Sequence, residues 1–132
     1  MNIKVCRSKS FSKISLKKLF LSVGWKSAEY PEILKKAMKN SSHIISAWNE
    51  SQLIGIIRSM DDGCWSANID CFVVEKSFQK NGIGTLLLTE LLKDLKNVKY
   101  INVSPDEKKF ISFYEKFGFK EIEGSYLQYQ NL

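Results

Sequence analysis

A buried strand that runs through a glycine-containing turn directly into a leucine-rich helix constrains this chain more than any other feature. Residues 72–92 read FVVEKSFQKNGIGTLLLTELL. The unbroken apolar run of residues 72–74 predicts the end of a buried strand, and Leu87, Leu91 and Leu95 predict one face of a helix over 83–95. A further strand is predicted at 99–103, so the two strands should form a parallel pair joined by a right-handed crossover.

The N-terminal two thirds of the chain predict short strands and helices in succession, with no repeat and no linker. Alternating apolar and polar residues predict four strands, of which the middle two form a hairpin. They cover 3–6, 43–48, 52–59 and 65–74. Ser12 and Ser15 offer N-caps to a helix that ends near Gly24, and Pro31 suits the first turn of a helix over 31–38.

The C-terminal part predicts one more helix and a closing hairpin. Ser104-Pro105-Asp106-Glu107 resembles a capping box with proline at the first helical position, which predicts a helix through Phe117. Two strands are predicted around Gly124, at 120–123 and 126–130. Because hairpins are antiparallel, the predicted fold class is α+β, with a mixed, mostly antiparallel central sheet flanked by about four helices.

Length and composition limit the class of protein. A chain of 132 residues, 44% of them hydrophobic, predicts one globular domain over 1–132. No window approaches 18 uninterrupted apolar residues, so no membrane span is expected. The three cysteines are odd in number and match no metal-binding spacing, which predicts free thiols in a reducing cytoplasm and no metal. The net charge of +6 is scattered over lysine pairs without an aromatic platform, which favours a polyanionic cofactor over nucleic acid.

The turn at 79–84 has the features of an anion site. The first amides of a helix have no partner inside it, and they point outward at the positive end of the helix dipole. Two glycines let an anion approach the backbone, Lys80 adds a positive charge and Asn81 adds a neutral donor. The turn lacks the third glycine of the dinucleotide-binding fingerprint and the Gly-Lys-Ser/Thr ending of the P-loop. From the glycines alone, a plain strand-to-helix turn remains an equal alternative.

The segment VVEKSFQKNGIGTLLL resembles the acetyl-CoA motif of the GNAT superfamily of N-acetyltransferases, which has Gln/Arg-x-x-Gly-x-Gly/Ala between a strand and a helix. The downstream FYEKFGF, residues 113–119, is similar to the second signature of that superfamily, Leu-Tyr-x-x-x-Gly-Phe. The separation of the two motifs and the element order over essentially the whole chain also resemble this family. Glu107 departs from the pattern, because many relatives have asparagine there, and Lys76 stands where proline is common.

The resemblance implies that the turn binds the pyrophosphate of acetyl-CoA and that the pantetheine arm lies along the preceding strand like an added strand. A β-bulge at 71–73 would splay the sheet there, and a backbone amide would stabilise the oxyanion of a tetrahedral intermediate. No metal is implied. The implied cofactor-binding residues are Phe72, Val73, Val74, Gln79, Lys80, Asn81, Gly82, Ile83, Gly84 and Thr85.

The resemblance also implies how protons move. Tyr114 matches the family tyrosine that protonates the departing CoA thiolate, although an aromatic residue at this position is also typical of a core. Asp70 interrupts an otherwise apolar strand, so it is the candidate that accepts the amine proton or binds the ammonium. A structural aspartate that bonds across the sheet is the open alternative for Asp70. Glu75 is expected to point to solvent.

The acceptor site is implied beside the first helix junction. Trp25, Tyr30 and Arg58 are the candidate substrate-binding residues, and Asp61 and Asp62 are expected to line the same opening. The predicted function is transfer of acetyl from acetyl-CoA to a primary amine of a small molecule or peptide, and a homodimer is left open. The alternative is a CoA-binding or partner-regulating module that retains the fold without catalysis.

Overall fold

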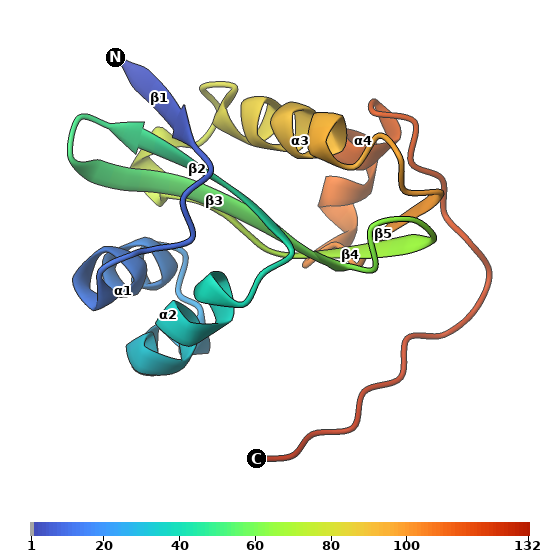
Figure 1. The fold of residues 1–132 in the computed structure, drawn as a ribbon, viewed down its shortest axis with the longest axis horizontal. Coiled ribbons are helices and arrows are strands. Elements are labelled where there is room, and N and C mark those ends of the chain that lie inside the picture. Colours follow the sequence, from blue (N-terminus) through green and yellow to red (C-terminus); the bar gives the residue numbers. More distant parts are fainter. Residues whose placement is uncertain (1) are drawn as a thin grey trace.

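A mixed five-stranded sheet forms the centre of the computed structural model, which describes residues 2–132 (Figure 1). The strands lie in chain order across the sheet. They are β1 (Ile3–Cys6), β2 (His43–Asn49), β3 (Gln52–Asp61), β4 (Ser66–Val74) and β5 (Tyr100–Val103). The first three neighbouring pairs are antiparallel and the pair of β4 with β5 is parallel, which confirms the predicted mixed sheet.

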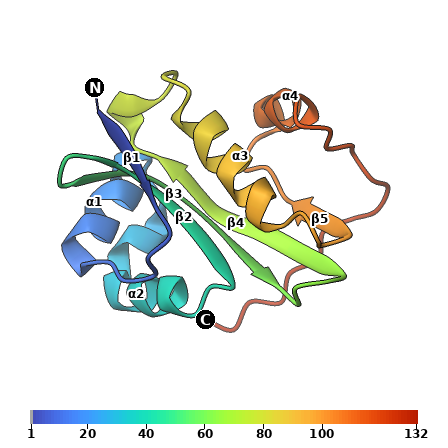
Figure 2. The same cartoon turned by 45° about the horizontal axis from the view of Figure 1, so that its top comes forward.

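Four α-helices cover the two faces of the sheet, which confirms the predicted number. They are α1 (Lys13–Ser22), α2 (Pro31–Lys39), α3 (Ile83–Asp94) and α4 (Ile111–Glu115). Helices α1 and α2 lie on one face, and α3 and α4 lie on the other (Figure 2). Each face therefore has a hydrophobic core of its own, one around Phe20 and Ile56 and the other around Leu87 and Ile57.

The core fixes where α3 begins. Leu87, Leu91 and Leu95 are fully buried, as their spacing predicts. Gly55 on β3 lies beneath this helix, and a Cβ at that position would come within 2.9 Å of Leu87 Cδ1. Glycine therefore permits a close approach of α3 to the sheet, so packing against β3 sets the position of the N-terminus of α3.

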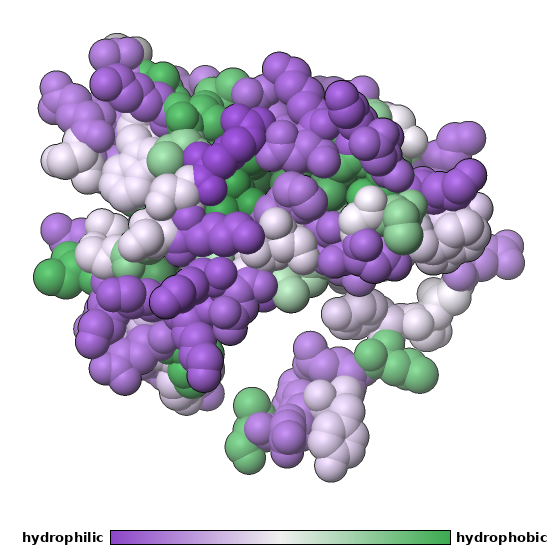
Figure 3. Space-filling model, in the orientation of Figure 1, coloured by the Kyte–Doolittle hydropathy of each residue, from purple (hydrophilic) through white to green (hydrophobic). Residues whose placement is uncertain are grey.

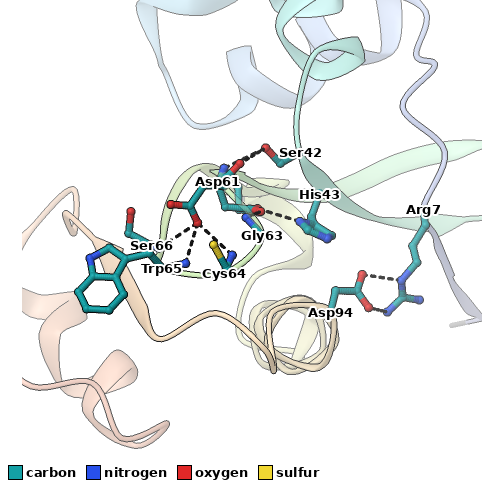
Figure 4. A network of polar contacts seen from close by, with 11 residues as sticks. Arg7, Ser42, His43, Asp61, Gly63, Cys64, Trp65, Ser66 and Asp94 are labelled. Carbon is teal, nitrogen blue, oxygen red and sulfur yellow. Dashed lines mark hydrogen bonds and ion pairs between the residues drawn. The ribbon is translucent and has the colours of Figure 1, made fainter.

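The turn between β3 and β4 is held by carboxylates, as Figure 4 shows. The Asp61 side chain is only 3% exposed and accepts hydrogen bonds from the Gly63 amide and from Ser59 Oγ, while its Oδ2 lies 2.8 Å from His43 Nδ1. Asp62 Oδ1 accepts hydrogen bonds from three backbone amides, those of Cys64, Trp65 and Ser66. This turn precedes β4 at the end of the strand remote from Val74, and neither aspartate is among the residues that line the groove described below.

The fourth helix starts later than the capping box predicts. Ser104 to Glu107 form a loop, a 3₁₀ turn covers Lys108–Phe110, and α4 is only five residues long. Ser104 and Pro105 lie outside any helix, and the 3₁₀ turn begins after Glu107 without a side-chain cap. The helix forms only where Phe113 and Tyr114 pack into the aromatic core.

The predicted C-terminal hairpin is wrong. Residues 119–132 form no strand, and the segment runs away from the sheet at the bottom of Figure 1. Its apolar side chains are exposed, with Ile122 at 81% and Leu127 at 90%, and Figure 3 shows apolar groups standing apart from the body. A hairpin needs a hydrophobic face to bury, and this one has none, so β5 is the edge of the sheet.

Among residues 2–132, no helix is long and apolar enough to cross a membrane.

Candidate active site

A β-bulge interrupts β4 at the position that the sequence predicts. Val73 pairs with Ile56 and Asp70 pairs with Arg58, so Ile57 on β3 faces two residues on β4, Cys71 and Phe72. The backbone of Cys71 has φ 50°, a left-handed conformation that is rare for residues other than glycine. The extra residue bends β4 and re-aims the side chains that follow it.

The parallel partner of β4 ends before the bulge. Strand β5 pairs with β4 from Ser66 to Ile69, and β5 stops at Val103. The half of β4 from Cys71 to Val74 therefore has β3 on one side and, among the described residues, no strand on the other. Its outward backbone groups are available to a ligand that lies alongside in an extended form.

A groove of about 470 Å³ runs along this open edge. Its walls come from the end of α1, the open half of β4, the turn after β4 and the loop between β5 and α4. They contain Leu21, Ser22, Val23, Gly24, Trp25, Phe72, Val73, Val74, Lys76, Gln79, Asp106 and Glu107. Ser22 fixes the width at one end, because its Oγ donates to the Leu19 carbonyl at 2.7 Å and accepts from the Lys76 amide at 3.2 Å.

The turn after the groove presents an uncapped helix N-terminus. Gly82 is the N-cap of α3, with φ 79°, no side-chain cap and no acidic residue in the first turn. Lys80 is also left-handed, with φ 66°. A Cβ on Gly82 would meet nothing within 4 Å, so the space beside the start of α3 is open at this residue. This arrangement suits a phosphate group, because the amides and the helix dipole both favour an anion.

Three side chains of the turn stabilise the turn itself. Asn81 Nδ2 donates to the carbonyls of Phe78 and Gln79, at 3.1 and 3.2 Å. Gln79 Nε2 donates to the Val74 carbonyl at 3.0 Å, so one backbone acceptor of the open edge is already bonded. The Glu75 carboxylate accepts from the Ser77 amide at 2.7 Å and caps the 3₁₀ turn, where we expected it to point to solvent.

Tyr114 lies in an aromatic cluster beside the groove. It is 8% exposed, and its ring centroid is 6.4 Å from that of Phe72 and 5.3 Å from that of Phe113. Burial, with a further contribution from the negative charge of Asp106, raises the pKa of Tyr114 to about 12. The phenol is therefore neutral at physiological pH and has a proton to donate. Phe72 forms part of the groove wall, and Tyr114 packs behind it.

Asp70 is paired across the sheet with Arg58. Arg58 Nε donates to Asp70 Oδ1 at 2.6 Å, and Arg58 Nη2 donates to Asp70 Oδ2 at 3.3 Å. Arg58 Nη1 donates to the Ala37 carbonyl on α2 at 3.5 Å and to Ser41 Oγ, after the end of α2, at 3.4 Å. The side chain of Arg58 is 15% exposed and that of Asp70 is 50% exposed, so the carboxylate is fixed in place and still open to a cationic group.

Cys71 belongs to the bulge and follows Asp70 in the chain. Burial, together with the negative charge of Asp70, raises the pKa of the Cys71 thiol to about 11. A thiol that is neutral at physiological pH is a poor nucleophile, because the thiolate is the reactive form.

The structure brings only part of the predicted acceptor site together. Trp25 lines the groove and packs edge-to-face on Phe20, with ring centroids 5.8 Å apart. Tyr30 is 50% exposed at the start of α2 and lies outside the groove. The sequence missed the wall that the end of α1 provides, because nothing in the pattern of that helix indicated which strand its C-terminus would face. It also gave no role to Asp106.

No cluster of three or more histidine, cysteine or acidic side chains that could hold a metal ion occurs within residues 2–132.

Comparison with known proteins connects this geometry to one family. Residues 12–130 match the family model described as "Acetyltransferase (GNAT) domain". The chain is 31% identical over 129 residues to an "Uncharacterized N-acetyltransferase ycf52" of Pyropia yezoensis, covering 93% of this chain and 74% of the relative. A protein of the same name in Porphyra purpurea is 31% identical over 138 residues, covering 88% and 79%.

Solved structures share the fold at lower identity. A putative acetyltransferase from Deinococcus radiodurans R1 superimposes with a TM-score of 0.84 at 23% identity, covering 96% of this chain and 87% of that chain. A GNAT family acetyltransferase from Streptococcus pneumoniae gives a TM-score of 0.80 at 24% identity, covering 98% and 100%. At this identity the structures establish the fold alone.

The buried phenol predicts a specific loss of stability at alkaline pH. The pKa of Tyr114 is about 12 in the folded chain and near 10 in an unfolded one, so its contribution is complete below pH 10 and is lost as the pH rises through 12. In urea unfolding, we expect the free energy of unfolding of the wild type to fall by about 1 kcal/mol more than that of Tyr114→Phe between pH 9.5 and pH 11. The control Tyr126→Phe, at a side chain that is 78% exposed, should follow wild type. Parallel pH curves for wild type and Tyr114→Phe would contradict the assignment.

Proposed function

The chain belongs to the GNAT acetyltransferase family, and from this premise we propose that it transfers the acetyl group of acetyl-CoA to a primary amine of a small molecule or peptide by direct attack. One observation carries the proposal: the open edge of β4 leads directly to the uncapped N-terminus of α3. A ligand with an extended, amide-containing arm and a pyrophosphate matches both features.

The residues of the groove and the turn fit acetyl-CoA. The amides from Lys80 to Thr85 would hold the pyrophosphate, and the bare Gly82 leaves room for it. The backbone of Phe72 to Val74 would hold the pantetheine arm, with Trp25 and Val23 on the opposite wall. Acetyl-CoA supplies an acetyl group activated as a thioester, and the net charge of +6 favours its encounter with the protein.

Direct transfer is supported by the state of the nearest thiol. An acetyl-enzyme route needs a nucleophile near the bulge, and Cys71 is the cysteine there. Its raised pKa, about 11, keeps it as a neutral thiol that does not compete with an incoming amine. Cys6 and Cys64 are exposed on other parts of the fold, outside the groove wall.

We assign two proton-handling roles. Tyr114 donates its phenolic proton to the departing sulfur, and burial keeps the phenol protonated before the transfer. Asp70 binds the ammonium form of the acceptor and receives its proton directly or through water. The pair with Arg58 leaves carboxylate lone pairs free, since each oxygen accepts one hydrogen bond from the guanidinium.

The pyrophosphate assignment predicts the effect of an acidic residue at the turn. Saturating acetyl-CoA should stabilise the wild type by about 3 kcal/mol at a hundredfold excess over Kd, because it binds only the folded chain. Gly82→Asp should lose this thermal shift because it places a carboxylate in the open space at the helix start, and Gly84→Asp should lose it because it adds a negative charge to the first turn, with its Cβ 3.7 Å from the Phe72 and Phe113 rings. Gly63→Asp is a matched control, because Gly63 also has a positive φ, 81°, with nothing near its Cβ. If acetyl-CoA raised the melting temperature of both turn variants as much as that of the wild type, the turn would not be the pyrophosphate site.

The acid role predicts a loss of turnover in Tyr114→Phe. The substitution keeps the ring in its aromatic cluster and removes only the hydroxyl. Turnover should fall about 100-fold, the usual effect of losing a general acid, while the Kd of acetyl-CoA stays within about twofold. The acceptor is first found by a screen of polyamines, aminoglycosides, amino acids and peptides with mass detection. A chain that binds acetyl-CoA and acetylates nothing in the screen would be a CoA-binding module.

If Asp70 binds the acceptor, Asp70→Asn should impair the use of the acceptor without changing the binding of acetyl-CoA. Acetyl-CoA binding should stay intact, while kcat/KM for the acceptor found in the screen falls about 10- to 100-fold and the acid limb of its pH profile shifts. A purely structural Asp70 would lower the melting temperature and leave the shape of the pH profile unchanged. Glu115→Gln on α4 is the control, because that carboxylate is exposed and outside the groove.

A further inference from the structure

The charge on the groove wall differs from the charge of the whole chain. The net charge of the protein is +6, yet the titratable residues that line the groove are Lys76, Asp106 and Glu107. The end of α1 contributes no titratable residue to the groove. The open half of β4 contributes none either, because the Cys71 thiol, whose pKa burial raises, is not part of the groove wall. The wall opposite α1 is therefore locally negative, and both of its carboxylates come from the loop between β5 and α4.

Asp106 is the more influential of the two carboxylates. Glu107 has Lys109 Nζ at 3.5 Å and its side chain is 61% exposed, so its charge is partly balanced and partly screened by water. Among residues 2–132, Asp106 has no ion-pair partner within salt-bridge distance. Its charge also reaches past the groove wall, because it contributes to the raised pKa of Tyr114.

A carboxylate at this place acts on the sulfur of the leaving group. On the proposed function, the thioester lies beside the bulge at Phe72, whose ring contacts that of Tyr114, and Phe72 and Asp106 line the same groove. A like charge nearby disfavours the charged form of an ionisable group, so a thiolate is less favourable in this groove than in water. A neutral thiol meets no such repulsion.

We propose that Asp106 is a positioning residue that keeps negative charge out of this part of the groove, so that the protein binds CoA in its thiol form in preference to its thiolate form. In the transfer step, the neutral amine nitrogen bonds to the acetyl carbon, the C–S bond breaks with its electron pair going to sulfur, and the nitrogen releases one proton to solvent. Tyr114 gives sulfur its proton. The phenolate then regains a proton from solvent, which the neighbouring Asp106 charge favours. CoA thus leaves as the neutral thiol.

The inference rests on the proposed function and has a test that needs no acceptor. The test compares CoA with desulfo-CoA, in which hydrogen replaces the thiol. The ratio of their Kd values cancels the titration of Lys76, Glu107, Tyr114 and the turn lysine, because these groups act on both ligands. A thiol ordinarily titrates near 8.5, so about a tenth of free CoA remains thiol at pH 9.5. The Kd ratio of CoA to desulfo-CoA should therefore rise about tenfold between pH 7.5 and pH 9.5 in wild type.

The experiment is isothermal calorimetry of both ligands at the two pH values. In Asp106→Asn the rise should fall below about threefold, and Asp106→Ser should repeat this result if the amide variant unfolds. Glu115→Gln should behave like wild type. An equal rise in wild type and the Asp106 variants, or no rise in wild type, would overturn the role of Asp106. Failure of desulfo-CoA to bind at pH 7.5 would instead overturn the proposed function.

Discussion

The mismatch of one residue between β3 and β4 is the constraint on which the site depends. Ile57 faces two residues of β4, so the strand bends at Cys71 and no longer runs alongside β5. An antiparallel sheet normally satisfies its backbone groups on both sides of an inner strand. Here the open half of β4 leaves such groups free at a groove. The strained, left-handed backbone of Cys71 is held in place by the packing around it.

The position of α3 places an uncapped helix N-terminus next to the open edge of β4. The leucine face of α3 packs on β3 over Gly55, which places the first amides of the helix immediately after the groove. On the proposed function, a helix shifted by one turn would move these amides by about 5 Å and separate the pyrophosphate from the pantetheine arm. The same hydrophobic contacts therefore stabilise the fold and align the two halves of the binding surface.

Electrostatics around the bulge favour neutral and cationic groups over anions, even though the chain is basic. The Cys71 thiol and the Tyr114 phenol are kept protonated by burial, and nearby carboxylates act in the same direction. Asp70 is held by the Arg58 guanidinium, which also donates to the Ala37 carbonyl on α2, so this ion pair connects α2 to the strand next to the bulge. The turn at the start of α3 has the opposite preference, because it presents an uncapped helix N-terminus and Lys80.

Local patterns in the sequence determined the elements that depend on local physics. Apolar periodicity predicts β4 and α3, a serine cap predicts α1, and the glycine turn after β4 predicts an uncapped helix start. These features follow from which side chains can be buried and which backbone groups lack a partner within a few residues. The failures are also informative: the alternation in 120–130 is a valid strand pattern, but a pattern cannot supply the surface against which a strand must pack.

The sequence alone therefore determined a strand, turn and helix suited to an anion and a mixed sheet around it, and the motif resemblance assigned the tyrosine. Only the tertiary structure decided that the end of α1 forms the facing wall, that Arg58 holds Asp70, and that Asp106 brings its charge to Tyr114. Such contacts join residues from different elements, and the distance between them is set by how whole helices pack on the sheet. No local propensity encodes that distance, because it results from the sum of many buried contacts spread across the chain.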